Sequence, residues 1–132
     1  MTPEENTEIV KRAYAAFKSG DMEALMRTYA DDISWEFYGP STIPTAGTRK
    51  GLAGVREFFA TVDSAMTAQS FEPREYIAQG DQVVVLGDYS WKIKSTGRTF
   101  TSNWAHVSTL KNGKVVRFRE YTDTAASAAA FA

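Results

Sequence analysis

Two long alternating segments near the C-terminus, Thr99–Leu110 and Val115–Asp123, constrain this chain most strongly. Alternation of this length predicts strands, and the Asn-Gly pair at 112–113 predicts a tight turn between them, because glycine adopts a positive φ at little cost. The first segment carries the only histidine, His106, and the second carries Glu120. The pairing register of this hairpin therefore decides whether the two side chains share a small volume.

Two registers are open for the hairpin. A three-residue loop at 111–113 sets Trp104 opposite Glu120, whereas a two-residue loop moves the pairing by one residue and sets Trp104 opposite Tyr121. The second register packs charged side chains against the core aromatics. We therefore predict the three-residue loop, since register follows the buried pattern.

The preceding segment, Gln82–Lys94, extends the same rows of pairs. A two-residue turn at 96–97 sets Tyr89 opposite Trp104 and Gly87 opposite His106. Cross-strand neighbours lie about 5 Å apart and diagonal neighbours about 7–8 Å apart. The sequence thus predicts two adjacent rows with Glu120 and His106 facing one space that Gly87 leaves open: Tyr89–Trp104–Glu120 and Gly87–His106–Phe118.

Glu120 and His106 form a candidate catalytic pair. A carboxylate and an imidazole enclosed by aromatic side chains suit general acid/base chemistry near neutral pH. The structural alternative is that Glu120 pairs with Arg98 or Arg119 and that His106 is a hydrogen-bonded core residue. Candidate substrate-binding residues are the aromatic side chains expected around the pair: Tyr14, Trp35, Phe37, Phe59, Tyr89, Trp91, Trp104 and Phe118.

The first third of the chain predicts two helices and a strand. Thr2 and Glu5 form a capping-box pattern, and Gly20 is typical of a helix stop. A second helix should run from Asp21 to about residue 32, and alternation at Ile33–Phe37 predicts a short strand.

The segment Tyr38–Lys50 is rich in glycine and proline and is long for a passive connection, so it is open to two interpretations, a mobile lid at a pocket mouth or a surface loop. A third helix begins at Gly51. Four strands should then form an antiparallel meander, with the first at Pro73–Gln79, and the tail Thr124–Ala132 is mildly helical. Helices followed by a sheet indicate an α+β fold.

Composition bounds the function classes. With 132 residues and 43% hydrophobic content, we expect one domain over residues 1–132 with a full core. The net charge of −1 and the interspersed charges predict neither a nucleic-acid nor a membrane partner. Because there is no cysteine and no apolar run of spanning length, we expect a cytoplasmic protein. One histidine and scattered carboxylates predict no metal site, and no nucleotide-binding loop suggests a cofactor.

The order of these elements resembles SnoaL-like proteins, which belong to the superfamily of nuclear transport factor two, ketosteroid isomerase and limonene epoxide hydrolase. Four stretches carry the resemblance: Ser19-Gly20-Asp21, Ala30-Asp31-Asp32, 47–51 and 113–123. The resemblance implies a cystatin-like α+β cone barrel, in which three N-terminal helices pack against a strongly curved, mainly antiparallel sheet around an apolar pocket. It also implies a homodimer through the outer face of the sheet, where we expect Ala105, Val107, Thr109, Arg117, Arg119 and Tyr121.

The resemblance extends unevenly to the site. The carboxylate that limonene epoxide hydrolase carries on its final strand matches Glu120, whereas the base position of ketosteroid isomerase is occupied by Phe37. SnoaL-type cyclases use a carboxylate near the end of the sheet, which Glu120 would supply, or Asp123 if the final strand is bulged.

Three hypotheses follow from the residues and the resemblance. The chain is a cofactor-free acid/base isomerase, cyclase or dehydratase that acts beside a carbonyl of a small apolar or aromatic molecule, or a non-catalytic ligand-binding module, or a dimeric interaction domain. An open cavity of about 300 Å³ or more favours the first two, and a cone filled by its tryptophans excludes them.

Overall fold

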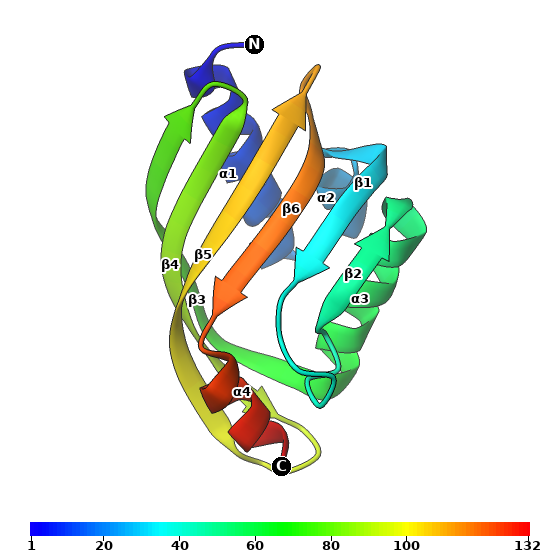
Figure 1. Cartoon of the computed structure of the whole chain (residues 1–132), viewed down its shortest axis with the longest axis vertical. Coiled ribbons are helices and arrows are strands. Elements are labelled where there is room, and N and C mark those ends of the chain that lie inside the picture. Colours follow the sequence, from blue (N-terminus) through cyan, green and yellow to red (C-terminus); the bar gives the residue numbers. More distant parts are fainter.

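A six-stranded sheet in the order β2-β1-β6-β5-β4-β3 forms the centre of the fold, with the long helices on one side of it (Figure 1). The computed structural model describes all 132 residues. Its elements are α1 (Pro3–Ser19), α2 (Met22–Met26), β1 (Tyr29–Phe37), β2 (Gly47–Lys50), α3 (Gly51–Ala65), β3 (Met66–Gln79), β4 (Gln82–Ile93), β5 (Thr99–Lys111), β6 (Lys114–Thr122) and α4 (Thr124–Phe131).

The sheet is mixed but mostly antiparallel. Strand β1 runs parallel to β6, and every other neighbouring pair is antiparallel. The predicted α+β fold is confirmed, but some boundaries differ. Helix α2 ends at Met26 rather than near residue 32, because Tyr29 already pairs with Val115 of β6. Strand β3 begins at Met66 rather than at Pro73, and β2 was not predicted.

Local capping signals place α1 where the sequence predicts it. Thr2 accepts a hydrogen bond from the Glu5 backbone, and the Glu5 carboxylate accepts one from the Thr2 backbone, which completes the capping box. Gly20 ends the helix in the left-handed conformation. These contacts fix the start and the end of the helix that carries Tyr14.

The predicted three-residue loop between β5 and β6 is wrong. Asn112 and Gly113 alone form the turn, with φ values of 52° and 78°, and Lys111 pairs with Lys114. A bulge then adds Val116 to β6, because Thr109 pairs with Arg117 but Leu110 with Val115. The bulge restores the inward face that a two-residue turn alone would have reversed. As a result, His106 pairs with Glu120 and Trp104 pairs with Thr122.

The turn between β4 and β5, in contrast, is longer than predicted. Lys92 pairs with Thr99, so Gly87 lies opposite Trp104 rather than opposite His106. In both predicted rows the paired residues are therefore displaced by two positions, although the side chains lie on the predicted face of the sheet. The space at Gly87 is filled, because a β-carbon there would clash with the Trp104 indole and with the carbonyl oxygen of Glu72.

The core lies between the inner face of the sheet and the helices. Its 24 buried apolar side chains form one cluster, to which α1, α2, α3, α4 and every strand except β2 contribute. Helix α4 lies at the lower end in Figure 1, where its Ala130 joins this cluster. No helix is both long and apolar enough to cross a membrane. The inner face of β4, β5 and β6 thus faces a space bounded by helices.

Candidate functional site

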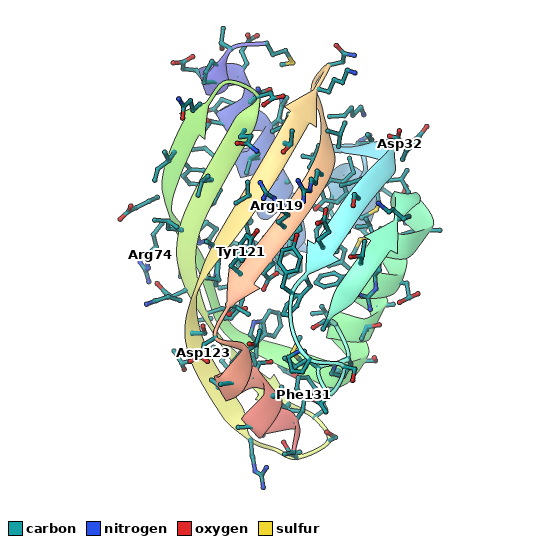
Figure 2. All side chains as sticks on the ribbon, in the orientation of Figure 1. Asp32, Arg74, Arg119, Tyr121, Asp123 and Phe131 are labelled. Carbon is teal, nitrogen blue, oxygen red and sulfur yellow. The ribbon has the colours of Figure 1, made fainter.

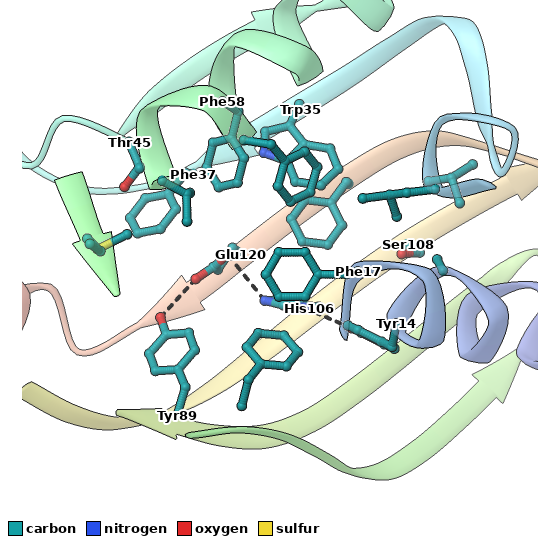
Figure 3. Close-up of a pocket in the computed structure, with 18 of the residues that line it drawn as sticks. Tyr14, Phe17, Trp35, Phe37, Thr45, Phe58, Tyr89, His106, Ser108 and Glu120 are labelled. Carbon is teal, nitrogen blue, oxygen red and sulfur yellow. Dashed lines mark hydrogen bonds and ion pairs between the residues drawn. The ribbon is translucent and has the colours of Figure 1, made fainter. Parts of the chain in front are cut away.

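An apolar cavity of about 90 Å³ lies inside this core (Figure 3). It is lined by 23 residues, of which 18 are hydrophobic. The interior is therefore neither filled by its tryptophans nor as large as the 300 Å³ or more expected of a pocket for a drug-sized ligand. A cavity of this size suits a small molecule.

Four polar side chains form a chain of polar contacts along the cavity. Tyr14 Oη of α1 lies 2.8 Å from His106 Nδ1 of β5. On the other side of the imidazole, His106 Nε2 lies 3.2 Å from Glu120 Oε1 of β6. Tyr89 of β4 donates its hydroxyl proton to Glu120 Oε2 at 2.8 Å. Figure 3 shows the chain, which joins a helix to three adjacent strands.

The two phenols of the chain remain protonated at neutral pH. Burial raises the pKa of Tyr14 well above its usual range, with smaller contributions from nearby tyrosines and Glu120. Burial, and then the charge of Glu120, likewise raise the pKa of Tyr89. Both phenols therefore keep their protons at neutral pH. Tyr14 Oη has no other partner in the chain, so its proton is satisfied only when it donates to His106 Nδ1, which is the arrangement of the imidazole tautomer that carries its proton on Nε2, beside Glu120.

The contact between His106 and Glu120 is close but not linear. His106 Nε2 is fully enclosed and has no well-aligned hydrogen-bond acceptor, although Glu120 Oε1 is 3.2 Å away. The side chains of His106 and Glu120 are only 5% and 8% exposed. A buried N–H without an aligned acceptor costs free energy, and catalytic hydrogen bonds often tighten only when a ligand is bound.

Glu120 is not paired with an arginine. Arg98 donates instead to the carbonyl oxygen of Ala129, and Arg119 projects from β6 on the outer face of the sheet (Figure 2). Asp123, the alternative carboxylate, does not line the cavity and caps α4 by accepting from the Ala126 backbone at 3.0 Å. Glu120 is the only acidic residue of the cavity lining.

Most of the candidate residues lie together at the cavity. The lining contains His106, Glu120 and seven of the eight aromatic candidates: Tyr14, Trp35, Phe37, Phe59, Tyr89, Trp91 and Phe118. Trp104 does not line it. Its ring stacks on the His106 imidazole at a centroid distance of 4.0 Å, and it crosses the inner face of β4 at Gly87. Trp104 therefore supports His106 from behind rather than offering a surface to a ligand.

Several lining residues were not predicted. They include three buried serine and threonine residues, Thr45, Ser108 and Ser127, and the aromatic residues Phe17, Tyr29, Phe58, Phe71 and Phe100. Ser108 follows His106 at strand spacing, so the alternation of β5 could have identified it. Thr45 and Ser127 lie in a loop and a helix that the sequence does not connect to the sheet.

The segment Tyr38–Lys50 is partly regular and partly buried. Its last four residues form β2, which pairs with β1, and Ile43 and Thr45 are each only 2% exposed. Thr45 lines the cavity, so the segment closes one end of it. The expected position beside the cavity is therefore correct. The expected mobility stays a prediction.

No group of three or more His, Cys, Asp or Glu side chains lies close enough together to hold a metal ion. The side chains around the cavity offer aromatic surface, hydroxyls, one imidazole and one carboxylate. This set favours proton transfer and hydrogen bonding to a small organic molecule.

The sequence from residue 10 to residue 118 matches the SnoaL-like domain. The chain belongs to the SnoaL-like family. The solved structure of an NTF2-like protein from Burkholderia xenovorans is similar, where NTF2 stands for nuclear transport factor two. It is 38% identical in sequence, its TM-score is 0.92, and the match covers 100% of this chain and 99% of that chain. The structure of TerC co-crystallised with polyporic acid is 31% identical, with a TM-score of 0.85 over 96% and 98% of the two chains.

Among the relatives of this SnoaL-like protein is an uncharacterised protein of Mycobacterium tuberculosis strain H37Rv. It is 25% identical over 128 residues, which cover 96% of each chain. The family and the NTF2-like fold implied by the sequence motifs are thus confirmed. These relatives do not define a reaction for this SnoaL-like protein.

Proposed function

We propose that this SnoaL-like protein binds a small apolar carbonyl compound and moves a proton beside its carbonyl group, as an isomerase, cyclase or dehydratase without a cofactor. The single observation that carries the proposal is the buried chain Tyr14–His106–Glu120–Tyr89 along an apolar cavity. A relative that was co-crystallised with polyporic acid supports a small organic molecule as the ligand of this fold.

Glu120 is the acid/base group in this proposal. Its carboxylate takes a proton from the carbon next to the ligand's carbonyl, and the electron pair of that C–H bond becomes the enolate. His106 Nε2–H is enclosed in the free protein and has no aligned acceptor there, so the bound ligand must open this contact before the N–H donates to the developing oxyanion. Glu120 then returns the proton to carbon. The step is balanced and needs no oxidant or reductant.

The other members of the chain position the pair. Tyr14 holds the proton of His106 on Nε2, and Tyr89 holds one oxygen of Glu120, which leaves Oε1 beside the imidazole. The aromatic rings keep water away, which strengthens each of these interactions. Small ligands are favoured, because the cavity measures about 90 Å³.

Hydrogen exchange tests the proposal without knowledge of the natural substrate. The protein is incubated in D₂O with cyclopentanone, cyclohexanone or acetophenone, and deuterium at the carbon beside the carbonyl is measured by NMR. We expect the wild type to accelerate exchange of at least one ketone and the Glu120→Gln variant to lose about 10²–10⁴-fold of that acceleration. Binding of the ketones without accelerated exchange would instead favour a non-catalytic ligand-binding module.

We further propose that the protein is a homodimer that buries the outer face of the sheet. Arg119 and Tyr121 project from this face, and Tyr121 is 43% exposed and packs against Tyr38 (Figure 2). Such a mixed apolar and polar surface is typical of dimer interfaces. Light scattering should give twice the mass of 14.6 kDa at micromolar concentration, and a monomer mass would refute the dimer.

A further inference from the structure

Four buried residues at the cavity, Tyr29, Thr45, Ser108 and Ser127, carry hydroxyl groups that the proton transfer proposed above does not use. Thr45 and Ser127 are the least exposed of the four. Thr45 and Ser127 both line the cavity, and each residue is only 2% exposed. At Thr45 the carbonyl oxygen accepts from Arg49 at 2.8 Å, and at Ser127 the backbone N–H donates to the Asp123 carbonyl at 3.1 Å. Neither side-chain hydroxyl has a partner within the chain, although buried polar groups nearly always have one.

The hydroxyls of Thr45 and Ser127 are also not sealed into the core. The fully enclosed polar side-chain atoms that lack partners belong to other residues, Trp35, Trp104, His106 and Arg119. The side-chain oxygens of Thr45 and Ser127 therefore keep an open side, and both residues line the same cavity. Two unpaired hydroxyls beside one apolar space indicate a contact for a polar group of a ligand.

The two hydroxyls come from neighbouring segments at one end of the molecule. Thr45 lies in the connection between β1 and β2, and Ser127 lies in α4. These segments touch, since a β-carbon at Gly39 would lie 3.2 Å from Thr124 Cγ2. Figure 3 shows Thr45 on the opposite side of Glu120 from Tyr14 and Ser108. The hydroxyl pair is thus separate from the end of the cavity where Tyr14 meets His106.

The charge of the lining restricts the polar group that this end accepts. No lysine or arginine lines the cavity, and Glu120 is its only acidic residue. A carboxylate or phosphate on the ligand would therefore be buried without a counter-charge, which is costly. A neutral hydroxyl or carbonyl fits, because Thr and Ser hydroxyls both donate and accept hydrogen bonds.

We infer that Thr45 and Ser127 determine substrate specificity by binding a second, neutral polar group of the substrate. The substrate is then a small ring compound with a carbonyl or enol at Glu120 and a hydroxyl or carbonyl at the opposite end. This inference rests on the proposed function of the same cavity. The alternative is that the two hydroxyls only hold buried water, which polar cavities often contain.

Two phenols of nearly equal size test the inference. Hydroquinone carries a second hydroxyl where p-cresol carries a methyl group, and both imitate an enol at Glu120. Binding is measured by calorimetry under argon with a thiol reductant, which is harmless because the chain has no cysteine. We expect the wild type to bind hydroquinone about tenfold more tightly than p-cresol, since two hydrogen bonds to the second hydroxyl outweigh the burial of one methyl group.

The preference for hydroquinone should disappear in the Thr45→Val, Ser127→Ala double variant, while the affinity for p-cresol stays the same or rises. The matched control is Ser108→Ala, which removes a hydroxyl from the other side of Glu120 and should keep the tenfold preference. Circular dichroism checks that each variant is folded. If the double variant does not fold, binding is measured with the Thr45→Val single variant instead. If the wild type bound both phenols with equal affinity, or if the measured variant kept the preference for hydroquinone, this inference would be overturned and the proposed function would still stand. Failure of the wild type to bind either phenol would overturn both.

Discussion

Replacing Glu120 with glutamine should change stability little while it abolishes the proposed chemistry. The variant keeps one oxygen that accepts from Tyr89, so this hydrogen bond loses only its charge assistance, and its amide nitrogen faces His106 Nε2, which has no aligned acceptor in the wild type either. Hydrogen bonds to charged groups contribute about 1.5–3 kcal/mol and neutral ones about 0.5–1.5 kcal/mol, so the loss is about 1 kcal/mol. The neutral amide also avoids the desolvation of a carboxylate in a residue that is only 6% exposed, which offsets the loss. We expect a net change within about 1 kcal/mol.

Urea denaturation at pH 7 measures this change in the free energy of unfolding. The chain has three tryptophans, Trp35, Trp91 and Trp104, and all are buried, so their fluorescence reports unfolding of the core. The matched control is Tyr89→Phe, which leaves the Glu120 carboxylate in place without its donor and should cost about 1.5–3 kcal/mol.

A loss of about 3–5 kcal/mol in the Glu120→Gln protein would refute the reasoning. Such a loss is expected when one partner of a buried ion pair is removed and the other charge remains. It would mean that His106 is protonated in the folded protein and that the pair is a structural salt bridge. The neutral imidazole inferred from the Tyr14 contact would then be wrong.

Three further predictions test the geometry. Tyr14→Phe leaves the imidazole Nδ1 nitrogen without a donor and should cost about 1–3 kcal/mol, whereas Tyr76→Phe, an adjacent ring whose hydroxyl bonds nothing in the chain, should be near neutral in urea denaturation. Gly87→Ala should lower stability by about 1–3 kcal/mol, because the new methyl group clashes with the indole that covers this glycine; an unchanged unfolding midpoint would disprove the pairing register. The Arg117 hydrogen bond lowers the pKa of Glu36 to about 2, so the wild type should lose stability as pH falls from about 4.5 toward 2, and Glu36→Gln should be less stable at pH 7 and flatter over that pH range.

The sequence predicted those parts of the fold that depend on neighbouring residues. The capping box at Thr2 and Glu5 fixes the start of α1 by contacts within one turn, and these residue types are specific for such contacts. Strand alternation placed His106 and Glu120 on one face correctly. The turn between them was predicted wrongly, because the bulge at Val116 changes the register in a way that the residue types do not reveal.

Contacts between distant segments were harder to predict. Tyr14 and His106 are 92 positions apart, and only the packing of α1 on the sheet brings them together. Strand β2 is short and mostly exposed, so it lacks the alternation that marks a half-buried strand. Thr45 and Ser127 resemble ordinary loop and helix residues, and only their burial beside the cavity distinguishes them.

The acid/base proposal and the specificity inference both depend on the chain of polar contacts from Tyr14 to Tyr89, and the only histidine of the protein reports on it directly. Long-range ¹H–¹⁵N NMR distinguishes the two nitrogens of a single imidazole without ambiguity. In the wild type at neutral pH we expect a protonated Nε2 that exchanges slowly with water, an unprotonated Nδ1, and an Nε2 signal that shifts in Glu120→Gln. A proton on Nδ1, or an imidazole that Glu120→Gln leaves unaffected, would contradict the account.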